Sequence, residues 1–442
     1  MLIFCLYAAV LLALGVLDAR RSRGSSAFFV NDRSSGTWHT GFSLAASCIG
    51  GSATIGMAGL AWQVGTPAFW WLGSGACGLC LLMLFIARKV RSSEAYTMPE
   101  IVSAWLGSRA AALVSFIIMP AWLAILAAQF TAMSGLTAAL TGLAPEAALP
   151  VGAAVIVAYS CLGGQASVIR SDLPQCLLLF AGLAAVLLLL LVQDASPLAA
   201  VPLELVNEDF GPDRFSYFMI IMGGSYLVCP MLFGRILSAR SSACAVRGCG
   251  LAVIMLFLAA GVVTALGILC RNIVPAGTAP DAVLSSAMTL LPPWAGMLLL
   301  VALLSAVLSS ADSCLVTAST VLCNDLLHRR SVALCRLVTL LFGACGLLLA
   351  GRGHGILDLL LMANDMYVCG VAVPVFTAML MKRGAVPSGA ALAAMLAGGA
   401  GGLASAVSGE PHFGYVGMAL AVAAVLCGRF MTPLLPAVGR PV

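Results

Sequence analysis

The stretch "SCIGGSATIGMAG", residues 47–59, lies inside an apolar run that is long enough to cross a membrane. Each glycine inside a helix costs about 1 kcal/mol relative to alanine, so this run unwinds easily. A second interrupted run, "MGGSYLVCP" at residues 222–230, carries two glycines and a proline. Matched interruptions, one in each half of a chain, indicate an inverted repeat. The pair therefore predicts two helical repeats, each with a broken helix.

The composition around these runs places the chain in a lipid bilayer. Of its 442 residues, 62% are hydrophobic and only 9% are charged, whereas a soluble domain is typically about half apolar and about a quarter charged. Apolar runs of about 17 to 25 residues, each able to cross about 30 Å of hydrocarbon, recur along the chain. About thirteen are expected, at residues 2–17, 38–62, 66–87, 111–141, 148–164, 174–193, 215–238, 248–270, 294–324, 331–350, 356–381, 387–407 and 413–429. The sequence predicts an all-α polytopic membrane protein.

The basic residues between the runs test this count, because an odd number of spans puts the termini on opposite sides. With the N-terminus outside, all but three of the 22 Lys and Arg residues, Arg235 included, fall on the cytoplasmic side, either between spans or within their inner ends. The exceptions are Arg214, Arg271 and Arg352. The positive-inside rule requires such a bias, so the net charge of +5 reports topology and argues against nucleic-acid binding. We expect an integral protein of a bacterial cytoplasmic (inner) membrane with its C-terminus inside.

Enzyme chemistry is not expected. The sixteen cysteines lie mostly within the spans, and the four histidines do not pair at metal-ligand spacing. No nucleophile and base pair stands out. The polar connections at 18–37, 88–110, 194–214 and 271–290 are too short to bury cores of their own.

A polar stripe runs along the expected helix at 294–324, within "LLSAVLSSADSC" at 303–314. Its members are spaced three or four residues apart and share one helix face: Ser305, Ser309, Asp312, Ser313 and Thr317. The hydroxyl of a lone serine can donate to the carbonyl four residues earlier in its own helix. A carboxylate at membrane depth, by contrast, costs several kcal/mol unless it is paired, protonated or facing a water-filled cavity. Serine hydroxyls facing carbonyls freed by the first break would supply neutral oxygens for a hard cation. The stripe indicates ion or proton chemistry, with a structural hydrogen bond from a protonated acid as the alternative.

Three further acids lie within spans or at their edges: Asp172 in "IRSDLPQ", and Asp358 and Asp365 in the span at 356–381. Asp172 alternatively begins a helix and is stabilised by the helix dipole. Asp358 is expected near the outer end, in water.

At these residues the sequence resembles the sodium:solute symporter family, which includes sodium-coupled proline, pantothenate, glucose and sialic acid transporters. The resemblance covers nearly the whole chain and is carried by four segments: "SEAYTMPEIVSAWLGSR" (93–109), "YSCLGGQASVIRSDLPQ" (159–175), "CPMLFGRILSAR" (229–240) and "LLSAVLSSADSCLVTASTVLCNDL" (303–326). It implies about thirteen transmembrane helices with the leucine-transporter-type inverted five-helix repeat, an exterior N-terminus and alternating access. The single transporter domain, 1–442, would comprise an extra helix and loop (1–37), two repeats (38–193 and 215–381) and two C-terminal helices with a short tail (387–442).

The resemblance also implies site residues. The principal sodium site would take the backbone carbonyls of Ala46, Ile49 and Ala306 and the hydroxyls of Ser309 and Ser310. The second ion site of some members would fall on Asp172, Ser309, Asp312 and Ser313. Because Asp312 replaces a hydroxyl there, a second sodium ion, a proton or neither are all open.

The solute contacts implied by the resemblance are Gly51, Ser52, Trp70, Gln129, Ser225, Tyr226, Asn364 and Tyr367. Each has a structural alternative: Trp70 as a membrane-interface aromatic, Gln129 as an interhelical bond and Tyr226 as a packing ring. Cys48 stands where proline-transporting members tend to have an acid, which weakens a proline assignment.

The sequence therefore predicts a sodium-coupled symporter that imports a small polar solute (an amino acid, organic acid, sugar or vitamin), with Na⁺ as the coupling ion. A proton-coupled symporter that uses Asp312 or Asp172 is one alternative. A membrane receptor or channel that transports nothing uphill is another.

Overall fold

The computed structural model of the protein describes residues 7, 9, 13, 25–204 and 206–431. Among these residues, ten helices are long and apolar enough to cross a membrane, and the bent pair Thr37–Cys48 and Ser52–Val64 makes a further span. A shorter apolar helix, Pro145–Cys161, stands where the fifth span is expected. Every expected span is thus accounted for except the first, residues 2–17, which lies almost wholly outside the described residues.

The spans are formed by these elements: α3 (Thr37–Cys48), η2 (Ser52–Gly56), α4 (Met57–Val64), α5 (Trp70–Phe85), α8 (Ser108–Thr141), α9 (Pro145–Gln193), α11 (Pro212–Tyr217), η4 (Phe218–Met222), α12 (Gly223–Leu227), α13 (Pro230–Ser238), α14 (Ser242–Leu269), α16 (Pro293–Val321), η7 (Leu322–Leu326), α17 (Val332–Ala350), α18 (Ile356–Leu380), α19 (Ser388–Ser408) and α20 (Pro411–Met431). Short helices occupy the connections: α2 (Ser25–Val30), η1 (Asn31–Arg33), η3 (Thr66–Phe69), α6 (Ala87–Ser92), α7 (Met98–Leu106), α10 (Ser196–Ala200), η5 (Cys270–Asn272), η6 (Pro280–Ala282) and α15 (Val283–Leu290).

The first predicted break is sharp. Helix α3 ends at Cys48, and the chain resumes in the π-helical turn η2 at an angle of 65°. The glycines at 50 and 51 stand at this corner, which agrees with their low cost of leaving helical geometry.

The second predicted break is milder. Val228 and Cys229 leave the helical region, and Pro230 starts α13. The whole segment Pro212–Ser238 nevertheless counts as one span and not as a bent pair. Pro230 suits the start of α13, because a proline at the first position of a helix has no N–H to leave unpaired and its φ is already helical.

Helix α9 contains two spans joined by a glycine corner. Gly164 has φ 65° and ψ −168°, which divides Pro145–Cys161 from the helix that follows. A Cβ at this glycine would lie 2.4 Å from the ring of Phe28. Only glycine combines this backbone conformation with so close a neighbour.

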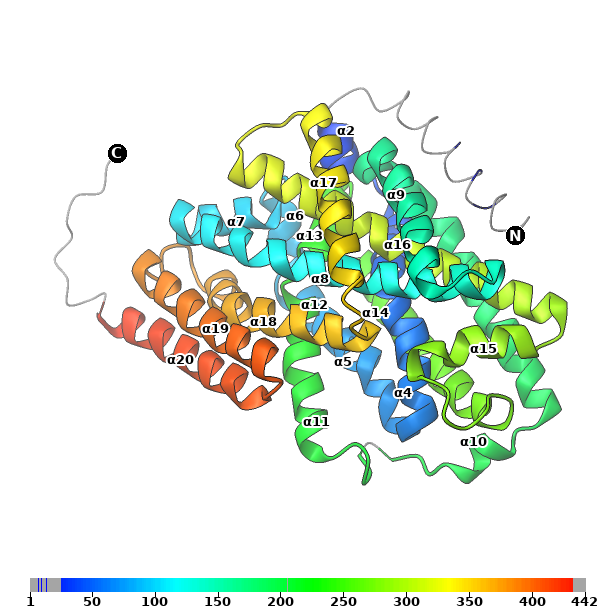
Figure 1. Cartoon of the computed structure of the whole chain (residues 1–442). Coiled ribbons are helices and arrows are strands. Elements are labelled where there is room, and N and C mark those ends of the chain that lie inside the picture. The colour runs from blue at the N-terminus through cyan, green and yellow to red at the C-terminus, as the bar shows by residue number, and fades with distance from the viewer. Residues whose placement is uncertain (1–6, 8, 10–12, 14–24, 205, 432–442) are drawn as a thin grey trace.

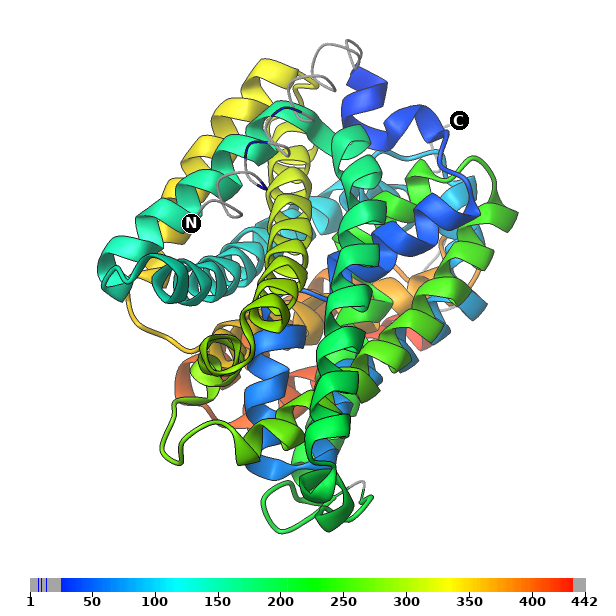
Figure 2. The same cartoon turned by 90° about the vertical axis from the view of Figure 1, so that its right-hand side faces the viewer.

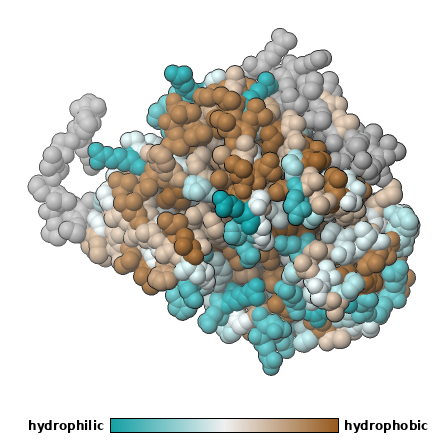
Figure 3. Space-filling view, viewed as in Figure 1, coloured by the Kyte–Doolittle hydropathy of each residue, from teal (hydrophilic) through white to brown (hydrophobic). Residues whose placement is uncertain are grey.

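Helix α16 lies at the centre of the bundle. Within its apolar membrane-crossing stretch, 78% of α16 is buried, against 28% for the corresponding stretch of α17 and 22% for that of α20. It packs against α8, α9 and α17 (Figures 1 and 2). Helices α18, α19 and α20, orange to red in Figure 1, pack together at one side of the molecule. Apolar residues cover much of the surface, and hydrophilic residues gather at the lower edge of Figure 3. The polar stripe of α16 is therefore inside the protein and not against lipid.

Candidate ion and solute site

Two serines of α16 reach the end of α3. The last carbonyls of a helix lack donors from their own helix, and that of Ala46 accepts the hydroxyls of Ser309 (3.1 Å) and Ser310 (3.2 Å) instead. Ser309 Oγ also lies 3.1 Å from the carbonyl oxygen of Ala306, to which it can donate. All four residues are buried. The fold thus brings together four of the five residues expected at the principal ion site.

The fifth residue, Ile49, stands at the break itself. Its φ of −95° and ψ of 70° turn its carbonyl out of the direction of the other helical carbonyls. Gly50 follows, and a Cβ there would lie 2.5 Å from Oγ of Ser310. Glycine therefore lets α16 approach the broken backbone. The result is a group of neutral carbonyl and hydroxyl oxygens, the ligand type that hard cations take.

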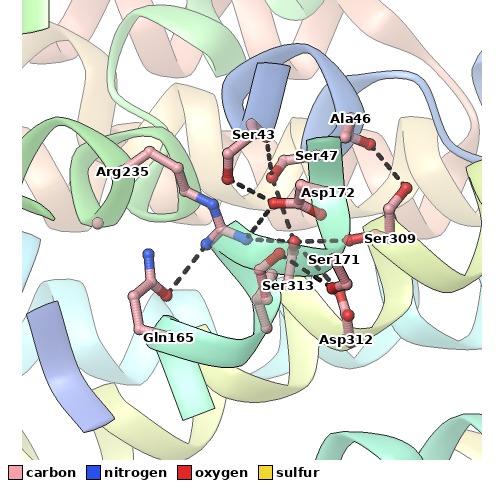
Figure 4. A network of polar contacts seen from close by, with 12 residues as sticks. Ser43, Ala46, Ser47, Gln165, Ser171, Asp172, Arg235, Ser309, Asp312 and Ser313 are labelled. Carbon is pink, nitrogen blue, oxygen red and sulfur yellow. Dashed lines mark hydrogen bonds and ion pairs between the residues drawn. The ribbon is translucent and has the colours of Figure 1, made fainter. Parts of the chain in front are cut away.

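A second polar cluster adjoins the first (Figure 4). Oδ2 of Asp172 lies 3.8 Å from the guanidinium of Arg235 and accepts a hydrogen bond from Ser43. The same guanidinium donates to Ser313 and, at 3.3 Å, to Gln165. Arg235 is fully buried. Arg235 was expected among the cytoplasmic charges, but α13 carries its side chain into the bundle, where Asp172 partly neutralises it.

Asp312 lies in the same cluster (Figure 4). Its Oδ1 lies 3.4 Å from the hydroxyl oxygen of Ser313, while its Oδ2 is buried without a hydrogen-bond partner in the described part of the chain. Oδ1 of Asp172 is likewise buried without a hydrogen-bond partner among the described residues. Two buried carboxylates thus face the one guanidinium of Arg235. Because an uncompensated buried charge is strongly destabilising, the charge balance of this cluster favours one additional cation.

The two clusters are connected through α16. The hydroxyl of Ser313 donates to the carbonyl of Ser309 at 2.6 Å and lies 3.1 Å from the hydroxyl of Ser47. Ser47 in turn donates to the carbonyl of Ser43, whose own hydroxyl bonds Asp172. A continuous series of polar contacts therefore joins the two clusters.

A central cavity of about 80 Å³ lies beside the break. Six of the eight expected solute contacts line it: Ser52, Gln129, Ser225, Tyr226, Asn364 and Tyr367. The rest of its wall is Ser47, Cys48, Gly50, Trp122, Ile125, Met222, Cys229, Met231, Leu232, Ser310 and Leu360. No aspartate, glutamate, lysine, arginine or histidine occurs among these lining residues.

The other two expected contacts have different places. The backbone N–H of Gly51 donates to Oε1 of Gln129 at 2.9 Å, which fixes that side chain at the cavity wall. Trp70 does not line the cavity, because its ring packs edge-to-face against Phe215, with centroids 5.1 Å apart, and against Phe69.

Two important residues were not singled out as site residues from the sequence. Trp122 lines the cavity and packs edge-to-face against Tyr367 at 5.2 Å, but a tryptophan on a long apolar helix carries no distinguishing signal. Arg235 did carry one, since it lies within an apolar run and inside the quoted "CPMLFGRILSAR" segment.

Comparisons with known proteins identify the family to which this chain is similar. The model of the family described as "Sodium:solute symporter family" matches residues 28–398. A curated relative, the sodium/proline symporter of Haemophilus influenzae, is 27% identical over 351 residues, which cover 73% of this chain and 69% of that protein.

Solved structures show the same fold. A Na⁺-coupled sialic acid symporter in a substrate-bound outward-open state is similar with a TM-score of 0.81 and 18% identity, over 99% of this chain and 98% of that one. MhsT in complex with L-phenylalanine is similar with a TM-score of 0.58 and 15% identity, over 88% and 98% of the two chains. Mhp1, a nucleobase-cation-symport-1 family transporter, is similar with a TM-score of 0.56 and 13% identity, over 93% of this chain and 96% of that one. These neighbours confirm the expected all-α, leucine-transporter-type fold.

Proposed function

Because the chain belongs to the sodium:solute symporter family, we propose that its coupling ion binds where the break after Cys48 meets α16. The protein is a sodium-coupled symporter and not an enzyme, as its family and its structural neighbours are transporters. The proposed ligands are the carbonyls of Ala46, Ile49 and Ala306 and the hydroxyls of Ser309 and Ser310. The observation that supports them is the position of both hydroxyls within 3.2 Å of the Ala46 carbonyl.

In this proposal, sodium acts as a tie between two separate helices. Binding turns the serine lone pairs toward the ion and draws the end of α3 to α16. Loss of the ion leaves weaker hydrogen bonds between neutral groups, each contributing about 1 kcal/mol. Sodium therefore favours one arrangement of the broken span relative to α16, and its release permits the other, as alternating access requires.

The central cavity is the proposed solute site. Its wall offers hydroxyl and amide groups together with the rings of Trp122 and Tyr367, and it carries no formal charge. A site of about 80 Å³ with these groups suits a small neutral or zwitterionic solute, which is a narrower class than the small polar solute expected from the sequence. Ser310 lines this cavity and also reaches Ala46, so the solute and the ion would share a wall.

A second cation is proposed at Asp172, Asp312 and Ser313, close to Ser309. The support is the charge balance of two buried carboxylates against one guanidinium. This cation is a second sodium ion or a proton. Uptake that follows a pH gradient and persists without sodium would favour the proton, whereas sodium activation with a Hill coefficient near two would favour the ion.

We propose that the basic end of the molecule faces the cytoplasm of the inner membrane. Arg33 and Arg330, from connections far apart in sequence, both stack on the ring of Tyr96, and Arg330 pairs with Glu100 at 2.8 Å. These connections therefore meet at one end, which is consistent with the distribution of basic residues along the sequence. At the other end, Asn272 bonds the carboxylate of Asp194. We also propose that the two repeats comprise residues 38–193 and 215–381, between the extra N-terminal segment and the two C-terminal helices.

Uptake by reconstituted protein tests the function. Proteoliposomes with an inward sodium gradient are screened with radiolabelled amino acids, organic acids and sugars. Accumulation above the external concentration that collapses when the sodium gradient is removed is the expected result. Equilibration without accumulation, for a solute that binds, would contradict symport.

A further inference from the structure

A large cavity, called the outer cavity below, opens at the end opposite to the basic connections. Its volume is about 780 Å³, roughly ten times that of the central cavity. Its walls are the segment from α11 through η4, the first half of α18 and the turn between α19 and α20 (Figure 1). None of its lining residues also lines the central cavity. It is therefore a separate space.

Asp365 lies at the base of the outer cavity. It stands nine residues after the start of α18, which places it about 14 Å along the helix at 1.5 Å per residue. Only 6% of its surface is exposed. Its neighbour in sequence, Asn364, lines the central cavity instead. Asp365 is thus a buried acid that the proposed ion and solute sites do not use.

The partners of Asp365 are neutral. Tyr217 donates its hydroxyl to Oδ1 at 2.7 Å, and Ser405 donates to Oδ2 at 3.0 Å. Neither ion pair found among the described residues involves Asp365. Two neutral hydrogen bonds compensate only part of the cost of burying a carboxylate at membrane depth. A cationic ligand at this carboxylate would offset the remaining free-energy cost of burial.

The rest of the outer cavity also favours positive charge. Asp213 and Asp358 line it together with Asp365, against a single arginine, Arg214, so the formal charge of the wall is negative when histidine is counted as neutral. The guanidinium of Arg214 is turned onto the ring of Phe218, 5.9 Å from its centroid.

Aromatic side chains contribute as well. Tyr217, Phe218 and Tyr415 line the same space, and aromatic faces attract ammonium groups. The hydroxyl of Tyr415 has no hydrogen-bond partner in the part of the chain that the structure describes. This oxygen is thus a buried polar atom whose hydrogen-bonding capacity is unused.

We propose that the outer cavity binds a cationic group at Asp365. The group is the ammonium of an amine-bearing solute on its way to the central cavity, or a free monovalent cation. The site would be external in the orientation proposed above. It does not depend on the principal sodium site, which lies on α3 and α16.

Charge-selective labelling of an introduced thiol tests this site. His412 is exposed and lines the outer cavity, so His412→Cys is labelled with a trimethylammonium and with a sulfonate methanethiosulfonate reagent, and the parent protein gives the background from exposed Cys345 and Cys427. The cationic reagent should react faster. Adding Asp365→Asn should lower the cation-to-anion rate ratio several-fold, because removing a negative charge slows the cationic reagent and speeds the anionic one. Asp209→Asn, which removes an exposed acid outside the cavity, is the matched control.

Protection distinguishes the two kinds of ligand. Slowing of the labelling by methylammonium, lost in Asp365→Asn, identifies a site for the solute ammonium, and slowing by Na⁺ or K⁺ alone identifies a site for a free cation. A rate ratio unaffected by Asp365→Asn, or lowered equally by Asp209→Asn, overturns the proposal, as does the absence of protection by all three ions. The sodium-induced thermal shift should survive in Asp365→Asn, which shows that the variant is folded and that the outer cavity is separate from the sodium site.

Discussion

Replacing Ser309 by alanine should weaken sodium binding by one to two orders of magnitude. Its hydroxyl oxygen lies 3.1 Å from the carbonyl oxygens of Ala46 and Ala306, so it stands among the oxygens proposed to hold the ion. A hydrogen bond or contact that involves a charged partner contributes about 1.5–3 kcal/mol. At about 1.4 kcal/mol for each factor of ten, its loss corresponds to about 10- to 150-fold. Alanine is the best helix former, so α16 itself should remain intact.

Thermal unfolding of the purified protein in Na⁺ against K⁺ at constant ionic strength measures this loss. Sodium at a hundred times its dissociation constant stabilises the native state by about 2.7 kcal/mol, and a hundredfold weaker variant would retain about 0.4 kcal/mol at the same concentration. Ser319→Ala is the matched control, because Ser319 is a buried serine of the same helix whose hydroxyl bonds the carbonyl of Val316 at 3.1 Å. A full sodium response in Ser309→Ala, equal to that of Ser319→Ala, would refute the assignment of the ion site.

Three further perturbations have expected outcomes. Gly50→Ala should remove sodium-dependent stabilisation, because its Cβ would lie 2.5 Å from a serine hydroxyl of α16, whereas Gly135→Ala, with nothing within 4 Å, should keep it; the same sodium titration compares the two. Arg235→Ala should lower the free energy of unfolding by about 3–5 kcal/mol by leaving a buried acid unpaired, and adding Asp172→Asn should recover part of the loss in melting temperature; a double variant as unstable as the single one contradicts the ion pair. Burial, assisted by a neighbouring carboxylate, raises the pKa of Asp281, so its ionisation destabilises the folded state as pH rises through that pKa. Asp281→Asn should therefore melt higher than the parent at pH 7 and equally below about pH 4; a difference independent of pH would exclude this cause.

The sequence was sufficient to predict features that depend on short segments. Span positions follow from hydropathy, the sharp corner after Cys48 follows from the glycines, and the shared face of Ser309, Asp312 and Ser313 follows from helical spacing. Each of these properties is decided within about twenty residues, so a single sequence contains it.

Features that depend on how distant helices pack could not be predicted in the same way. The carboxylate of Asp365 bonds a tyrosine 148 positions and a serine 40 positions away, and no local pattern connects them. The burial of Arg235 beside Asp172 and the displacement of Trp70 from the cavity wall have the same origin. A charge in a sequence shows that it must be neutralised somewhere, but only the packing shows by which partner.

The position of Ser310 gives a physical basis for coupling. This serine belongs to the proposed sodium ligands and also to the wall of the solute cavity, while Gly50, beside it, is both the corner of the broken span and part of that wall. An ion that holds α3 against α16 therefore also completes the solute site. Coupling between binding equilibria is reciprocal, and a free energy of about 1–3 kcal/mol changes either affinity about 5- to 150-fold. Bound solute should then raise the affinity for sodium by the same factor by which bound sodium raises the affinity for the solute. In this proposal the shared wall would couple the movement of the two ligands directly, without a pathway through the rest of the bundle.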